Sequence, residues 1–151
     1  MKRVRILIAE DNPADVWLIE EALKRQSMEY EIENYTTAEE AIIAVGKCGT
    51  DAKPLPDLML VDYNLPTGHG GSILAAAAEN PKLSHTPKAV VTSFLQPHEL
   101  KLALDLGAQC VITKPANLED FMTEVGGKIA EMARGRGDST VESSSARSGA
   151  S

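Results

Sequence analysis

Short, unbroken runs of apolar residues alternate along the chain with segments whose apolar residues recur at helical spacing. The clearest run is 58–61, which leads directly into Asp62 and then into the glycine- and proline-rich segment 64–71. A run without polar residues at alternate positions indicates a strand that is buried on both faces. The proline and glycines that follow prevent the strand from continuing. Asp62 is therefore expected at the carboxyl end of a central strand.

The same pattern predicts four further strands, at 4–9, 29–35, 89–93 and 110–113. Helices are predicted to follow the strands, at 14–26, from 36 or 37 to 46, at 70–80, at 97–107 and after Asn117. Strands that alternate with helices predict a parallel sheet with helices on both faces and right-handed crossovers. The expected fold class is therefore α/β, a three-layer, doubly wound (βα)5 domain.

The C-terminal part of the chain carries two further features. Gly126 and Gly127 lie within the last predicted helix, where a glycine costs about 1 kcal/mol relative to alanine, so a kink or fraying is expected. Over residues 134–151 glycine and serine dominate and no apolar periodicity continues, which predicts a flexible tail. The expected organisation is one domain at 1–133 followed by this tail.

Composition and charge narrow the function classes. The chain has 151 residues, 43% of them hydrophobic and 25% charged, as in an ordinary globular domain. Its formal net charge of −7 argues against nucleic-acid binding, which requires a basic surface. The first apolar run ends at Glu10, too early for a signal peptide or a membrane span, so a cytoplasmic protein without membrane association is expected.

Polar residues with complementary chemistry end four of the predicted strands. The first strand ends in Glu10 and Asp11, the third in Asp62. The fourth ends in Thr92 and the fifth in Lys114. Each of these alone is more often a cap or a loop residue, but the carboxyl ends of parallel strands share one edge, where ligands bind in open α/β sheets.

Three carboxylates at one edge repel each other unless a cation is present. Because the set offers oxygen ligands without cysteine or histidine, it favours a hard ion, and Mg²⁺ fits best. An aspartate, a divalent cation, a lysine and a hydroxyl together predict a phosphoryl-transfer site with a carboxylate nucleophile.

This set of residues resembles that of receiver domains, the response regulators of two-component signalling. The matching positions are Glu10-Asp11, Asp62, Pro66, Gly70, Thr92 and Lys114-Pro115. The resemblance covers residues 4–133 and implies the flavodoxin-like receiver fold with strand order 2-1-3-4-5. The stretch 10–16 is further similar to single-domain regulators associated with bacterial phytochromes and hybrid kinases.

The resemblance also implies how the site works. Asp62 would accept a phosphoryl group from a sensor histidine kinase or a phosphotransfer protein, phytochrome-like or hybrid kinases being candidates. Asp11 and Asp62 would bind Mg²⁺ directly, Glu10 through water, and Asn64 through its backbone carbonyl. The protein would be a phosphoacceptor switch, with no enzymatic activity beyond its own phosphotransfer and dephosphorylation.

Thr92 and Lys114 would contact the phosphoryl oxygens, and the bond from Lys114 to Pro115 would be cis, as in relatives. Phosphorylation would then shift the protein between two pre-existing states. One departure affects this readout: Val111 stands three residues before the lysine, where the family usually has Tyr or Phe. The inward swing of an aromatic ring at that position is therefore excluded.

Three other functions have specific requirements. A haloacid-dehalogenase-like Mg²⁺ phosphatase would need an acid two residues after the nucleophile, where this chain has Asn64. A flavodoxin-like cofactor binder would need a phosphate-binding loop in place of Glu10 and Asp11. A phosphorylation-independent receiver scaffold would not need the intact acid, hydroxyl and lysine set.

Output is expected through a protein partner, through a phosphorelay or through a homodimer. The downstream target is unknown, and no nucleic acid is expected. Phe121 or a leucine between 100 and 106 could anchor self-association.

Overall fold

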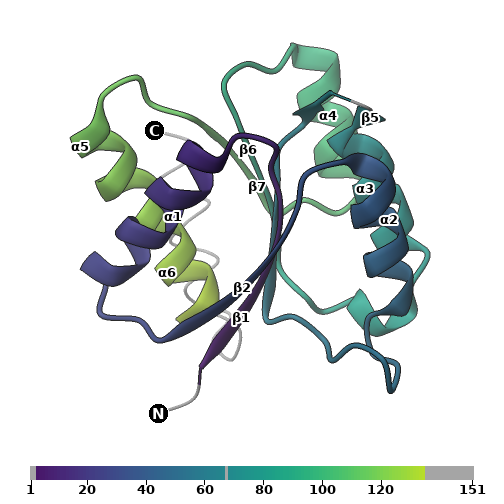
Figure 1. Cartoon of the computed structure of the whole chain (residues 1–151). Helices are drawn as coiled ribbons and strands as arrows, with labels where there is room; N and C mark the ends of the chain where they lie inside the picture. Colours follow the sequence, from purple (N-terminus) through teal and green to yellow (C-terminus); the bar gives the residue numbers. More distant parts are fainter. Residues whose placement is uncertain (1–2, 67, 135–151) are drawn as a thin grey trace.

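The computed structural model describes residues 3–66 and 68–134. Its centre is a five-stranded parallel sheet in the order β2-β1-β3-β6-β7 (Figure 1). Numbered among themselves, these strands have the predicted order 2-1-3-4-5, and the α/β fold class is confirmed. The strands are β1 Val4–Ala9, β2 Tyr30–Tyr35, β3 Leu58–Val61, β6 Lys88–Thr92 and β7 Cys110–Thr113.

Helices cover both faces of the sheet (Figure 1). One face carries α1 Pro13–Arg25 and a C-terminal helical segment made of α5 Leu118–Asp120, the π-helical η2 Phe121–Val125 and α6 Gly126–Arg134. The other face carries α2 Ala38–Lys47, α3 Gly70–Ala78 and α4 Pro97–Asp105, and a short 3-10 helix, η1 Pro81–Leu83, follows α3.

Alternation along the central strands divides the core into two layers. In β1, Ile6 and Ile8 pack with the α1 and α6 side, whereas Leu7 and Ala9 pack with the α2 and α3 side. All four side chains are almost fully buried. This is the two-sided burial that unbroken apolar runs predict.

Side-chain caps begin three of the helices. Asn12 Oδ1 accepts a hydrogen bond from Ala14 N at 2.9 Å and starts α1, with Pro13 in the first turn. Thr37 and Asn117 cap α2 and α5 in the same way. The first of these caps fixes the turn that immediately follows Glu10 and Asp11.

The C-terminal helical segment is irregular, but not at the two glycines where a kink or fraying was predicted. The irregular part is the π-helical η2, which ends at Val125, and α6 starts at Gly126 and continues without interruption to Arg134. A Cβ atom at Gly126 would lie 2.9 Å from Ala22 Cβ of α1, whereas one at Gly127 would meet nothing within 4 Å. Gly126 therefore lets α6 approach α1 closely.

Three further expectations are corrected. The segment after Asp62 contains a short antiparallel hairpin, β4 Asn64–Leu65 and β5 Gly68–His69, where a loop was predicted. The bond from Lys114 to Pro115 is not cis, because the described residues contain no cis peptide, and trans is the favoured isomer of most such bonds. Phe121 is only 3% exposed and belongs to the core, so it cannot anchor self-association.

The fourth helix shows its leucines to solvent. Leu100, Leu102 and Leu104 are 40%, 47% and 45% exposed, while Ala103 is fully buried. The helix thus packs through a small residue, and these leucines are the ones available for a partner. Within the described residues, none of the helices has the length and apolar character needed to cross a membrane. The predicted tail lies outside the described residues, apart from Arg134.

Candidate functional site

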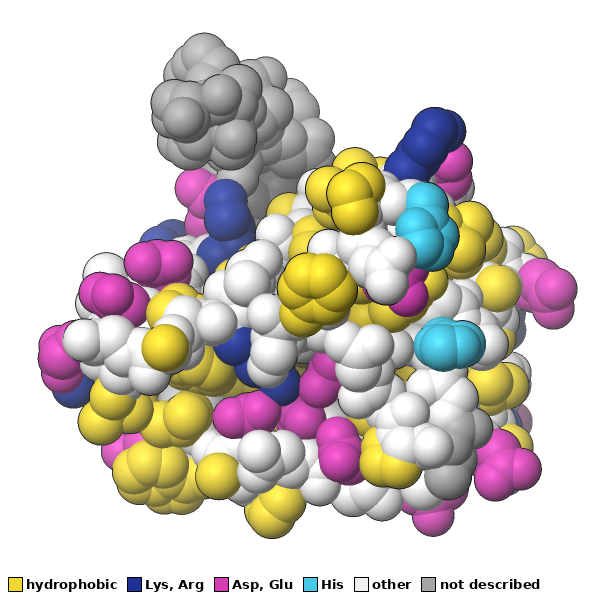
Figure 2. All heavy atoms as spheres, turned by 90° about the horizontal axis from the view of Figure 1, so that it is seen from above, with side chains coloured by type: hydrophobic (Ala, Val, Ile, Leu, Met, Phe, Trp, Pro, Cys, Tyr) yellow, Lys and Arg dark blue, Asp and Glu magenta, His cyan; other side chains and the backbone are white. Residues whose placement is uncertain are grey.

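The carboxyl ends of the parallel strands form the edge at the top of Figure 1, and Figure 2 looks onto this edge. Acidic side chains gather there beside basic atoms near the middle of the face (Figure 2). Glu10 follows β1, Asp62 follows β3, and Lys114 follows β7. The predicted convergence of strand ends therefore brings these three side chains together.

Three acids form a compact group at this edge. Glu10, Asp11 and Asp62 each offer a carboxylate oxygen, and these oxygens lie within 4.8 Å of one another. Glu10 and Asp62 are buried, with exposures of 3% and 8%, whereas Asp11 is exposed. The donors are all hard oxygen atoms, and the opening toward Asp11 leaves one side for water or a ligand, so the group suits a divalent cation.

Backbone hydrogen bonds hold the two buried acids in place. Asp62 N donates to Ala9 O at 2.9 Å, and Asn64 N donates to Asp62 Oδ1 at 2.9 Å. Glu10 N donates to Tyr35 O at 3.0 Å, and Asn12 N donates to Glu10 Oε2 at 3.2 Å. Both carboxylates are thereby oriented from the strands on which they sit.

Lys114 places its ammonium among the acids. Its Nζ lies 2.8 Å from Glu10 Oε1, 3.1 Å from Asp62 Oδ2 and 2.6 Å from Asp15 Oδ2. The side chain is 9% exposed, and its backbone N donates to Thr92 O at 2.7 Å. The sequence predicted the first two partners by convergence of strand ends, but it did not single out Asp15.

Burial and charge act in opposite directions on these groups. Burial raises the pKa of Glu10 to about 7, although the hydrogen bond and the charge of Lys114 act to lower it. Burial lowers the pKa of Lys114, but hydrogen bonds with Asp15 and Glu10 and the charges of Glu10 and Asp62 outweigh this, so the pKa is raised overall. Lys114 is therefore a permanent cation, and full ionisation of Glu10 calls for more positive charge than Lys114 supplies.

Thr92 is completely buried at the end of β6, and Asn64 holds its hydroxyl. Asn64 Nδ2 donates to Thr92 Oγ1 and to Phe94 O, both at 3.0 Å. The side chain of Asn64 thus links the loop after Asp62 to the loop after β6. The sequence pointed to Asn64 only through its backbone carbonyl, so this link is an addition to the site.

Gly70 lets the start of α3 lie directly against the segment that carries Asp62. A Cβ atom at this position would be 2.8 Å from Asp62 O and 2.8 Å from Tyr63 Cα, both backbone atoms that cannot move aside easily. Gly70 N also donates to Tyr63 O at 2.9 Å. Glycine is therefore required here by a close approach of two backbone segments.

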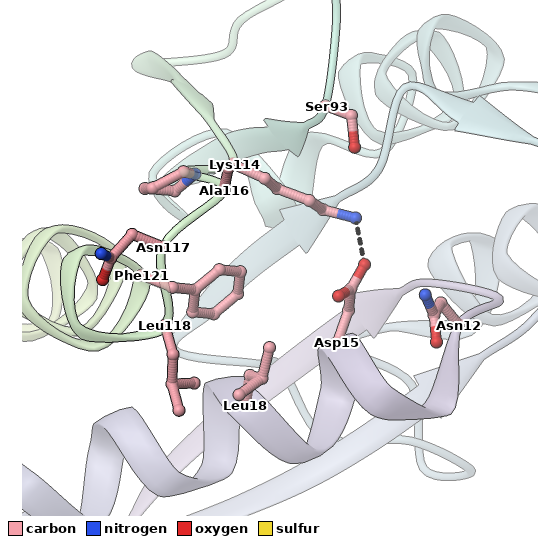
Figure 3. Close-up of a pocket in the computed structure, with 10 residues that line it drawn as sticks. Asn12, Asp15, Leu18, Ser93, Lys114, Ala116, Asn117, Leu118 and Phe121 are labelled. Carbon is pink, nitrogen blue, oxygen red and sulfur yellow. Dashed lines mark hydrogen bonds and ion pairs between the residues drawn. The ribbon is translucent and has the colours of Figure 1, made fainter.

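A pocket of about 500 Å³ opens beside Lys114 (Figure 3). It lies between the first turns of α1 and the segment that leads from β7 into α5. Lys114 points across it toward Asp15, and Leu18, Leu118 and Phe121 provide an apolar wall (Figure 3). Its remaining lining residues are Asn12, Ser93, Pro115, Ala116 and Asn117.

Comparison with known proteins decides the family. The model of the response regulator receiver domain matches residues 6–126 of the chain. This chain belongs to the response regulator receiver domain family. The receiver is 32% identical over 123 residues to response regulator Rcp1 of Synechocystis sp., an alignment that covers 81% of this chain and 84% of Rcp1.

Solved structures agree with this assignment. The phosphorylated cyanobacterial phytochrome response regulator RcpA has a TM-score of 0.76 and 33% identity to the receiver, with 84% of this chain and 91% of RcpA covered. The Mn²⁺-bound form of Rcp1 has a TM-score of 0.73 and 31% identity, with 82% of this chain and 90% of Rcp1 covered. Together with the acidic group, the bound ion in Rcp1 supports a divalent cation site in this receiver.

The receiver resembles these two relatives over most of their length, and its acids, hydroxyl and lysine meet at one edge. Asp15 is the contact that sequence reasoning missed. The sequence offered little reason to single out Asp15, because acids are common in the first turn of a helix, where the helix dipole stabilises them.

Proposed function

We propose that this receiver is a phosphorylation-controlled switch in which Asp62 accepts a phosphoryl group from a phosphohistidine. The observation that carries the proposal is the position of Asp62, which is buried at a strand end. Its carboxylate converges with those of Glu10 and Asp11, and its Oδ2 lies 3.1 Å from the Lys114 ammonium. An anion that attacks an anionic phosphoryl group needs positive charge close to the reacting atoms, and the lysine and a cation held by the acids would supply it.

The chain's own groups divide the work of the transfer. A carboxylate oxygen of Asp62 forms the new bond to phosphorus, while the bond from phosphorus to the imidazole nitrogen breaks and its electron pair stays on the ring. Asn64 N holds Asp62 Oδ1 at 2.9 Å and fixes the direction of the carboxylate. Lys114 neutralises charge on the phosphoryl oxygens. The Thr92 hydroxyl, which donates to Phe94 O at 3.4 Å, turns to donate a hydrogen bond to one of them.

We propose Mg²⁺ as the ion, held by Asp11 and Asp62, by Glu10 through water and by the backbone carbonyl of Asn64. When bound, it supplies charge neutralisation to the phosphoryl oxygens during transfer. The support is an oxygen-only donor set of three acids, one of them open to solvent, which is typical of an ion that keeps several waters.

We also propose which kind of protein donates the phosphoryl group, that the receiver is cytoplasmic, and how it passes the signal on. RcpA is described as a phytochrome response regulator, and this likeness favours a phytochrome-like or hybrid sensor histidine kinase, or a phosphotransfer protein, as donor. Both cysteines are free thiols, as expected in the reducing cytoplasm. Output is proposed through partner binding, a phosphorelay or a homodimer, with the exposed leucines of α4 available as contacts.

Asn64 argues against the phosphatase alternative, and we propose that the protein has no separate substrate. A haloacid-dehalogenase-like enzyme needs a general acid two residues after the nucleophile, but Asn64 carries an amide that is engaged with Thr92 and Phe94. A scaffold that works without phosphorylation is the remaining alternative. It differs from our proposal because its Asp62 would not need to accept a phosphoryl group.

The test uses acetyl phosphate with Mg²⁺ as the phosphoryl source and intact-protein mass spectrometry as the readout. The wild type should gain one acid-labile phosphoryl group, and the Asp62→Ala variant should gain none. Asp105→Asn is the matched control, because Asp105 is an exposed acid on α4 that pairs with Lys101 and should leave labelling unchanged. Equal labelling of wild type and Asp62→Ala would overturn the assignment of Asp62, and no labelling at all would favour the scaffold.

A further inference from the structure

We propose that Asp15 is a positioning residue that draws the Lys114 ammonium away from Glu10 and Asp62 when a divalent cation binds between the acids. The inference rests on the proposed function, because it concerns the cation site used in the transfer. It assigns a role to a side chain that lies outside the group of acids suited to the cation.

The competition for Glu10 and Asp62 is the first step of the argument. Both carboxylates belong to the acidic group that suits a cation, and both also accept a hydrogen bond from Lys114. An ammonium and a divalent ion that share two carboxylates repel each other across a few ångströms, and burial leaves little water to screen them. Cation binding therefore requires Lys114 to give up part of its contact with these two acids.

Asp15 offers Lys114 a carboxylate that the cation does not use. The distance from Lys114 Nζ to Asp15 Oδ2 is 2.6 Å, shorter than the distances to Glu10 and Asp62. Asp15 lies outside the group of acids whose oxygens converge. An ammonium that moves fully onto Asp15 therefore keeps a charge-assisted hydrogen bond while it frees the other two carboxylates.

The fold holds Asp15 rigidly in this position. It lies in the first turn of α1, where Asn12 caps the helix and Asp15 N donates to Asn12 O at 3.0 Å. The helix N-terminus stabilises a negative charge at this point. The Asp15 side chain is 19% exposed and that of Lys114 is 9% exposed, so the pair is shielded more than an ordinary surface ion pair.

The pocket beside the site gives Lys114 the room to move. Lys114 and Asp15 both line it, and the lysine side chain extends across its mouth toward Asp15 (Figure 3). The displacement toward Asp15 therefore leads into open space and not into the packed core. Loss of Asp15 removes one of the three carboxylates that the ammonium contacts, so the ammonium stays on Glu10 and Asp62 and competes with the cation.

The experiment is a titration with Mn²⁺, followed by the electron paramagnetic resonance signal of the free ion, on full-length protein. Four proteins are compared: wild type, Asp15→Asn, Lys114→Gln and the double variant. Asp15→Asn should weaken Mn²⁺ binding about tenfold in the wild-type background, the size of one charge-assisted contact. In the Lys114→Gln background the same change should alter binding less than about twofold, since no ammonium then needs a place to go.

Two controls make the outcome decisive. Asp120→Asn removes one negative charge from an exposed position on α5, next to the pocket residue Phe121, and should leave Mn²⁺ binding close to that of wild type. Thermal unfolding of each variant shows whether α1 is intact. An equal effect of Asp15→Asn on Mn²⁺ binding in both backgrounds would show that Asp15 acts only as a negative charge near the site and not through Lys114, which would overturn the inference. No effect in the wild-type background would also overturn it. A wild type that binds no Mn²⁺ would instead overturn the proposed cation site and the inference with it.

Discussion

Cation binding should depend steeply on pH around neutrality, because Glu10 is a buried acid whose pKa burial raises to about 7. The groups that act on it are Lys114, which contacts it at 2.8 Å, and Asp62 in the same cluster. A cation favours the ionised carboxylate, so binding lowers the pKa of Glu10 and releases a proton wherever Glu10 was protonated beforehand. The affinity must then rise with pH, since raising the pH ionises Glu10 in advance.

The size of the pH effect on cation binding follows from the pKa of Glu10. With a pKa near 7, about one-tenth of the free protein has an ionised Glu10 at pH 6 and about nine-tenths at pH 8. The apparent association constant for Mn²⁺ should therefore increase about tenfold between pH 6 and pH 8 and change little above pH 8. Isothermal titration calorimetry in buffers with different ionisation enthalpies measures both the affinity and the number of protons released.

The Glu10→Gln variant is the control for this prediction. It keeps the shape of the side chain but cannot ionise, so its weaker Mn²⁺ binding should be flat between pH 6 and pH 8. A pH dependence that persists in Glu10→Gln would show that another group causes it, and a flat profile in the wild type would equally refute the reasoning about Glu10.

Two glycine predictions concern stability. Gly127→Ala should stabilise the protein by up to about 1 kcal/mol through helix propensity, whereas Gly126→Ala should destabilise it by about 1–3 kcal/mol because its methyl group collides with Ala22. Urea unfolding of both variants checks this, and equal midpoints would contradict the proposed contact between helices. Gly70→Ala should also cost about 1–3 kcal/mol, and since its methyl group would push on the carbonyl of Asp62, acetyl phosphate should label it more slowly; a variant with wild-type midpoint and labelling rate would show that the backbone yields there.

Hydrophobic periodicity was sufficient to predict the sheet and its helices, since burial on two faces produces unbroken apolar strands and burial on one face produces helical spacing. It was not sufficient for β4 and β5, because two-residue strands contain no repeat to detect. It also did not show how α4 packs. The helix approaches the sheet through Ala103 and leaves Leu100 and Leu104 partly exposed.

The sequence predicted those residues of the candidate site that lie at the ends of strands. Glu10, Asp62 and Lys114 meet because parallel strands end at one edge, and that edge could be inferred from the order of elements alone. Asp15 could not be found in this way, since it lies on a helix and reaches the site only through the length of the Lys114 side chain. The side-chain link from Asn64 was equally hidden, because it depends on the distance between two loops.

The close contact between Gly126 and Ala22 also has an evolutionary consequence. Helix α1 carries Asp15, and the segment that ends in α6 carries Phe121 on the opposite wall of the pocket, so the spacing of these helices sets the width of the pocket. In descendants of this sequence, a larger residue at 126 requires a repositioned helix, because its Cβ would lie 3.1 Å from the backbone oxygen of Ala22 as well as 2.9 Å from the Ala22 side chain. Position 126 is therefore held to glycine by the packing of two helices, although it does not touch the chemistry.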